Sequence, residues 1–185
     1  MGWFSPVKGA YPSLGQVDKT LPVEKAFNTL RRGMIVALGT GDGSKYQSEG
    51  IWKLPAAATD ILYIALQDYN DPTAGFAGTS FDPKGDGTPR VTAIDVHQDG
   101  EYETDMFDPA IASTVKIGDM LYASATGYLT TDNSATGAFV GYVTGVPTER
   151  WVNNAVAVPP GNNTDPRLAV RTGANVTVIR FKTGK

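Results

Sequence analysis

The sequence predicts an all-β fold, a small β-barrel or β-sandwich with at most one short helix. Gly (21 residues) and Pro (12 residues) are abundant in this 185-residue chain, and only 19% of residues are charged. Short apolar runs rich in β-branched and aromatic residues alternate with turn residues, whereas long stretches of strong helix formers are missing. The hydrophobic fraction of 41% is sufficient for a packed core.

Residues 1–22 are predicted to form an extended N-terminal arm. Pro6, Pro12 and Pro22 favour extended or polyproline II backbone. The arm carries four large apolar side chains: Trp3, Phe4, Tyr11 and Leu14. One interpretation is a frayed terminus, and the other is a strap on a neighbouring subunit, because aromatic residues are enriched at interface hot spots. The rest of the chain, residues 23–185, is expected to form a single β-rich domain.

Residues 23–32 are the one candidate for a helix. Val23, Ala26, Phe27 and Leu30 fall at helical spacing, and Gly33 is placed where a helix would end. The segment is short, so we expect no more than two or three turns.

After Gly33 the pattern is that of short strands separated by turns. The predicted strands cover residues 34–38, 51–54, 61–66, 91–96, 101–106, 120–124, 128–131, 138–143, 151–158, 168–171 and 176–181. Turn residues at 99–100, 125–127 and 172–174 predict three hairpins. Strands this short and this regularly spaced indicate a sandwich or barrel.

Residues 68–89 form a long predicted loop rich in Gly, Asp and Pro. It contains Tyr69, Phe76 and Phe81. Loops of this length are uncommon in compact domains and usually have a function or are disordered. Because of the three aromatic residues, we expect an ordered contact loop.

A short internal repeat is visible in the sequence. Residues 33–37 can be aligned with 118–122, and residues 50–54 with 127–131. Each pair is followed by an apolar strand, at 61–66 and at 138–143. Any β-meander could give such a match by chance, so the repeat supports the β architecture alone.

No catalytic residue, cofactor site or metal site is predicted, and the protein is not expected to be an enzyme. The absence of Cys excludes disulfides, thiol nucleophiles and thiolate zinc sites. The only histidine, His97, lies beside a turn, where a surface position is expected. The Gly-rich residues 39–45 lack the Gly-Lys-Ser/Thr order of a phosphate loop. Glu101, Glu103 and Asp105 alternate on one strand, which is typical of a solvated face.

Charge and hydropathy exclude two kinds of partner. The net charge of −3 is spread over single residues, which gives no basic surface for nucleic acid or an anionic membrane. No apolar run is long enough to span a bilayer. The N-terminus lacks the basic and apolar regions of a signal peptide, so we expect assembly in the cytoplasm.

One region resembles a known family. Residues 116–131 followed by 139–143 resemble the small decoration (cement) proteins of tailed-phage capsids, in which a G-D-x-L-Y strand, a G-x-L-T return and a V-G-x-V strand recur. The family's closing L-x-V-R strand is matched by residues 168–171, and residues 32–38 look like its first core strand.

The resemblance implies a β-tulip-like structural protein on the exterior of the virion, assembled in the bacterial host. Its partners would be the major capsid protein and other copies of itself in a homotrimer, and it would stabilise the mature shell. The candidate interface residues are Trp3, Phe4, Tyr11, Leu14, Tyr69, Phe76 and Phe81.

Two alternatives stay open at this point. The chain could be another phage structural subunit, from a tail tube or a fibre base. It could also be a carbohydrate-binding module, in which Trp52, Trp151 and Tyr128 would stack on sugar rings.

Overall fold

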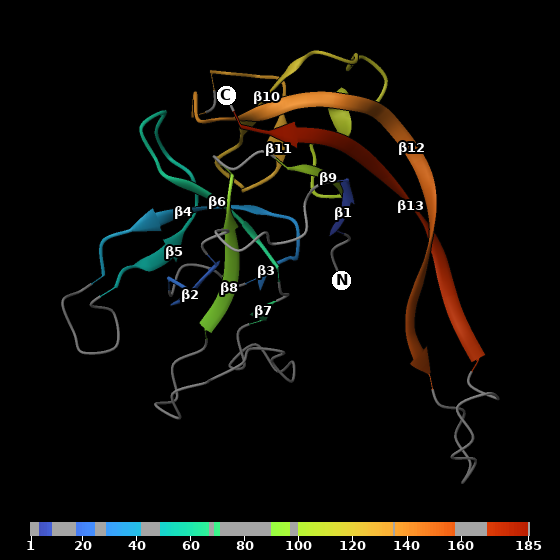
Figure 1. The fold of residues 1–185 in the computed structure, drawn as a ribbon, viewed down its shortest axis with the longest axis horizontal. Coiled ribbons are helices and arrows are strands. Elements are labelled where there is room, and N and C mark those ends of the chain that lie inside the picture. Colours follow the sequence, from blue (N-terminus) through green and yellow to red (C-terminus); the bar gives the residue numbers. More distant parts are fainter. Residues whose placement is uncertain are drawn as a thin grey trace, which may run out of the picture.

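The computed structural model is an all-β structure with two antiparallel sheets, which confirms the predicted fold class (Figure 1). It describes residues 4–8, 18–24, 29–41, 49–66, 69–70, 90–96, 100–134, 136–157 and 170–184. Within these ranges, the side chains of residues 151–157 and 170–175 are among those outside the description.

The larger sheet has six strands and the smaller has five. In spatial order the six-stranded sheet contains β1 (Phe4–Lys8), β9 (Glu101–Thr104), β13 (Val170–Thr183), β12 (Phe139–Ala157), β10 (Met120–Ala123) and β11 (Leu129–Thr130). The five-stranded sheet contains β2 (Asp18–Pro22), β8 (Arg90–Asp95), β6 (Leu62–Ala65), β4 (Ile35–Gly39) and β5 (Ile51–Lys53). A two-stranded ladder joins β3 (Thr29–Leu30) to β7 (Tyr69–Asn70), and η2, a short 3₁₀ segment, spans Pro109–Ile111.

The two sheets are built from the same five-strand unit, used twice along the chain. The first unit, residues 18–95, has the spatial order β2-β8-β6-β4-β5, and the second, residues 101–183, has the order β9-β13-β12-β10-β11. In each unit the strand at the far edge also forms a parallel bridge with a residue one to three positions after the end of the opening strand. These bridges are Val23 to Trp52 and Phe107 to Leu129. The repeat visible in the sequence is therefore a duplication of structure.

The aligned glycines explain why the repeat can be seen in the sequence. Gly33, Gly50, Gly118 and Gly127 all have positive φ, at 89°, 106°, 93° and 80°, a conformation that glycine adopts without steric cost. The amide of Gly33 donates to the carbonyl of Ala65, and that of Gly118 donates to the carbonyl of Val143, both at 2.8 Å. The same hydrogen bond thus links the turn before the second strand of each unit, β4 or β10, to the fourth strand, β6 or β12.

The main core lies between the sheets, and the five-stranded sheet is buried on both faces. One of its faces, with Ile35 and Ile64, packs in the same cluster as Leu121 and Phe181 of the six-stranded sheet. The opposite face, with Val36 and Tyr63, belongs to a second cluster. The six-stranded sheet contributes only one face to the shared core.

The described parts of residues 1–22 are edge strands rather than a separate arm. β1 pairs with β9, and β2 pairs with β8. Phe4 is buried in the shared core and stacks on Tyr102 with a ring-centroid distance of 5.0 Å. Pro6 and Pro22 fit these places because proline, which has no N–H, is tolerated on edge strands.

Two other local predictions also differ from the structure. β8 and β9, which flank the turn predicted at 99–100, lie in different sheets, so they form no hairpin with each other. Within the predicted helix 23–32, Val23 bridges to Trp52 and Thr29–Leu30 is a strand, while residues 25–28 lie outside the described part. The hairpin at 125–127 is confirmed by the pairing of β10 with β11.

β12 and β13 form a long two-stranded arm. They contain 19 and 14 residues, against a usual strand length of about five or six, and they curve away together from the sheets (Figure 1). The predicted turn at 172–174 lies inside β13, where Gly173 pairs with Asn153. We call residues 148–157 and 170–178, which pair with each other from Thr148–Val178 to Ala157–Val170, the hairpin arm.

Candidate functional site

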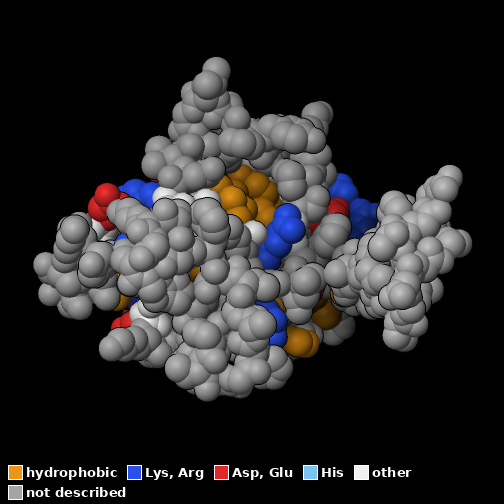
Figure 2. All heavy atoms as spheres, turned by 90° about the horizontal axis from the view of Figure 1, so that it is seen from below, with side chains coloured by type: hydrophobic (Ala, Val, Ile, Leu, Met, Phe, Trp, Pro, Cys, Tyr) orange, Lys and Arg blue, Asp and Glu red, His pale blue; other side chains and the backbone are white. Residues whose placement is uncertain are grey.

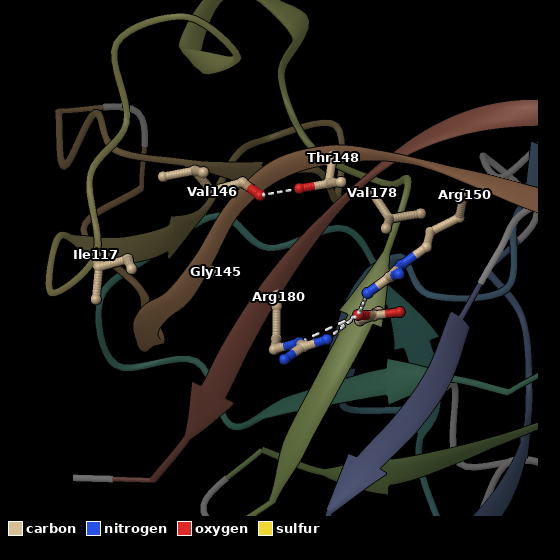
Figure 3. A pocket seen from close by; sticks show the side chains of 8 residues that line it. Ile117, Gly145, Val146, Thr148, Arg150, Val178 and Arg180 are labelled. Carbon is tan, nitrogen blue, oxygen red and sulfur yellow. Dashed lines mark hydrogen bonds and ion pairs between the residues drawn. The ribbon is translucent and has the colours of Figure 1, made fainter.

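A hollow of about 240 Å³ lies at the root of the hairpin arm (Figure 3). It is on the outer face of the six-stranded sheet, because Val178 and Arg180 alternate with Ile179 and Phe181, which point into the shared core. Its walls come from β9, β12, β13 and the turn before β10. The lining residues are Glu103, Ile117, Gly145, Val146, Thr148, Arg150, Val178 and Arg180.

One carboxylate ties three strands together at this root. Glu103 Oε1 accepts a hydrogen bond from Arg150 Nη2 at 2.9 Å, and two from Arg180, from Nη2 at 2.7 Å and from Nε at 3.1 Å. Figure 3 shows both guanidinium groups directed at the same carboxylate. Glu103 is only 8% exposed, so a largely buried carboxylate links β9, β12 and β13 where the arm leaves the sheet.

The charge state of the cluster follows from its hydrogen bonds. Burial raises the pKa of Glu103, but the bonds and charges of Arg180 and Arg150 outweigh burial and hold the pKa below its ordinary value. Glu103 is therefore ionised at neutral pH. Two guanidinium groups against one carboxylate leave a net positive charge beside the apolar side chains of Ile117 and Val146.

The local sequence of β12 provides the bend. The β12–β13 register shifts on both sides of Gly145, which is the mark of β-bulges. A Cβ on Gly145 would lie 3.0 Å from the Cβ of Arg180, so the missing side chain lets the two strands approach closely. Bulges bend a strand and increase its twist, which agrees with the curvature of the arm.

None of the predicted interface residues is seen at the hollow: Phe4 lies in the core, and the side chains of the others lie outside the described part. Phe4 fills the core of its own chain, has no free face for a partner and does not line the hollow. Tyr69 is described by its backbone alone, paired in β7 with Leu30. Trp3, Tyr11, Leu14, Phe76 and Phe81 lie outside the described residues, and so does His97.

Sequence reasoning missed the residues that do meet. Glu103, predicted to lie on a solvated face, is buried and paired instead. Arg150 and Arg180 lie 47 and 77 positions further along the chain, so only the β9–β13–β12 pairing brings them together. The one signal available beforehand was Arg180, the single charged residue of the predicted strand 176–181, whereas Arg150 follows Glu149 outside any predicted strand.

The stacking surface of a carbohydrate-binding module is not supported. Trp52 is fully buried, and its Nε1 donates to the carbonyl of Val91 at 2.7 Å. Tyr128 is exposed, while the side chain of Trp151 lies outside the described part. Trp52 is therefore a core residue and has no face for a sugar.

Among the described residues, no three His, Cys, Asp or Glu side chains gather as metal ligands, and no helix is both long and apolar enough to cross a membrane. Seen from below, hydrophobic side chains reach the surface beside Lys and Arg side chains (Figure 2). No family model, curated protein or solved structure matches the chain.

Glu103→Gln is expected to lower the free energy of unfolding at pH 7 by about 1–2 kcal/mol, because it leaves two partly exposed arginines without their charged partner. Because the pKa of Glu103 is lower in the folded protein than in the unfolded chain, the ionised carboxylate stabilises the fold at pH values above the pKa of the unfolded state. This stabilisation is lost as the pH falls through the pKa of the folded state. The difference between wild type and Glu103→Gln should therefore shrink on acidification. Urea unfolding of both proteins at pH 7 and pH 3 measures it, and an unchanged difference would contradict this role of Glu103.

Proposed function

We propose that this protein is a structural virion protein that binds the outer surface of a tailed-phage capsid and stabilises the mature shell. The sequence resemblance suggests this class of protein, and the hairpin arm is the observation that carries the proposal. In this function the arm is the docking element, and the charged hollow at its root sets its direction.

The arm is built as an element that needs a partner. A two-stranded hairpin in water is marginally stable at best. Within the described residues, β12 pairs with β10 only over residues 139–142, and β13 pairs with β9 only over residues 179–182. Along the arm, both outer edges are thus without a neighbouring strand in the described part of the chain. Such edges are suited to pairing with a strand of another protein.

Stabilisation of the shell would follow from binding one state of it. A protein that binds only the expanded shell lowers the free energy of that state, by about 2.7 kcal/mol per site when its free concentration is a hundred times the Kd. A homotrimer would engage three contacts at once and gain avidity. No bond is made or broken in this mechanism.

Co-sedimentation tests the proposal. Expanded, DNA-free capsids assembled from the major capsid protein encoded with this chain should bind it saturably and should resist heating better when it is bound. Unexpanded shells are the matched control and should bind far less. If neither shell binds the chain, the proposal fails, and rings or tubes of the isolated protein in electron micrographs would indicate a tail-tube subunit instead.

A further inference from the structure

The hollow at the root of the hairpin arm carries more positive than negative charge. Among the described residues that line it, Glu103 is acidic, whereas Arg150 and Arg180 are basic. The next cross-strand pair on this face of the sheet, Glu101 with Lys182, adds one charge of each sign and leaves the balance unchanged. The hollow thus lacks one negative charge to balance its second guanidinium group.

The two guanidinium groups have hydrogen-bond donors to spare. A guanidinium group can donate through Nε, Nη1 and Nη2. Arg150 uses Nη2 alone, Arg180 uses Nη2 and Nε, and every one of these bonds ends on Glu103 Oε1. Within the described part of the chain, neither arginine has another acceptor. The Arg150 side chain is 45% exposed and the Arg180 side chain 35%, so an acceptor from another molecule can reach them.

The rest of the lining is mostly apolar (Figure 3). Val178 is buried, whereas Ile117 and Val146 are exposed. A free inorganic anion would gain nothing from these side chains, because it has no apolar surface to bury. At about 240 Å³ the hollow is also smaller than the roughly 300–1,000 Å³ of most small-molecule sites. Its size and its mixed lining suit one acidic side chain of a protein segment together with an apolar neighbour.

The hollow is continuous with the docking element of the proposed function. Thr148, Arg150 and Val178 line the hollow and also belong to the hairpin arm, which begins at the Thr148–Val178 pair. A protein that contacts the arm near this pair is therefore already next to the hollow. This continuity favours a protein segment over a separate small ligand as the occupant.

We infer that the hollow binds an Asp or Glu side chain of the capsid protein, with an apolar neighbour of that residue against Ile117 and Val146. The inference rests on the proposed function and names the chemistry of its partner. A carboxylate accepts two parallel N–H bonds from a guanidinium group, an arrangement for which arginine is better suited than lysine. Arg150 is the more exposed of the two arginines, so it is the principal donor.

Arg150→Gln and Lys182→Gln form a matched pair of variants. Each removes one positive charge from the same face of the sheet, but Lys182 does not line the hollow. In co-sedimentation, Arg150→Gln should raise the Kd for expanded capsids at least about tenfold, because a hydrogen bond between charged groups is lost. Lys182→Gln should change the Kd less than about twofold. Arg180 keeps both bonds to Glu103 in Arg150→Gln, so the fold should persist, which circular dichroism and thermal unfolding check.

Glu103→Gln separates binding from a structural role of Arg150. This variant breaks the same ion pair from its other end and frees both guanidinium groups. If Arg150 only held the arm in place, Glu103→Gln would weaken shell binding as much as Arg150→Gln does. An incoming carboxylate instead gains from the loss of the Glu103 charge, so Glu103→Gln should bind expanded capsids at least as tightly as wild type.

A peptide probe tests the hollow without a shell. Acetyl-Val-Glu-Val-amide should shift the NMR signals of the Nε–H groups of Arg150 and Arg180, whereas acetyl-Val-Gln-Val-amide should not. Equal effects of the two peptides would overturn the inference, and so would a Glu103→Gln protein that binds shells as weakly as Arg150→Gln.

The two proposals can fail separately. If wild type and Arg150→Gln bind expanded shells equally well, the inference about the hollow is overturned and the proposed function stands. If wild type binds no shell, the proposed function fails, and the capsid protein is refuted as the source of the carboxylate. A response to the acidic peptide alone would then still support a carboxylate site in the hollow.

Discussion

Gly141→Ala is expected to lower the free energy of unfolding by about 3 kcal/mol or more. Gly141 lies in β12, opposite Leu121 on β10 and Thr183 on β13. A Cβ at this position would lie 2.0 Å from the carbonyl oxygen of Lys182 and 2.9 Å from its carbonyl carbon. Both atoms are backbone, so no change of rotamer relieves the clash, and β12 must move away from β13 at the centre of the sheet.

Gly118→Ala is the control for that variant. Gly118 has a φ of 93°, but a Cβ there would have no atom within 4 Å. Its cost is the backbone conformation alone, about 1–2 kcal/mol. Urea unfolding should therefore rank wild type above Gly118→Ala and Gly118→Ala well above Gly141→Ala. Equal stability of the two variants would contradict the close approach of β12 and β13.

Removal of the hairpin arm is expected to reduce affinity for expanded capsids at least about a hundredfold. The variant replaces residues 147–178 by an Asn-Gly turn, which suits a two-residue connection between antiparallel strands. The shared core should persist, because Ile179 and Phe181 of β13 and Val140 and Val143 of β12 remain. Co-sedimentation measures the loss of binding.

Two controls separate docking from folding in that experiment. Circular dichroism should confirm that the shortened protein is still a β-structure. Glu103→Gln keeps the whole arm while removing the ion pairs at its root, so it should retain more affinity than the shortened protein. A shortened, folded protein that binds shells as well as wild type would rule out the arm as the docking element.

The parts of the fold that the sequence predicted are those set by local chemistry. Strand and turn residues identified the all-β class and the β10–β11 hairpin. Gly33 and Gly118 could be aligned because both units need a positive φ just before their second strand, β4 or β10. The repeat was nevertheless understood only from the strand order, since short motifs in β-proteins recur by chance.

The remaining features depend on contacts between distant residues. Thr172–Gly173–Ala174 has the composition of a turn, but continuous pairing with β12 keeps this segment extended. The acidic pattern around Glu103 gave no sign of burial, because its partners Arg150 and Arg180 arrive from two other strands. Pro6 and Pro22 indicated extended backbone correctly, but no local pattern shows that such a segment pairs with a sheet edge.

A reconstruction of expanded capsids decorated with the full chain, by electron cryomicroscopy, tests the central claim most directly. The account predicts density for this protein on the outer surface, with β12 and β13 beyond Gly145 in contact with the capsid protein and the two five-strand units further out. Undecorated shells at saturating protein would contradict it, and so would a bound molecule whose β12 and β13 extend into solvent while another surface makes the contact.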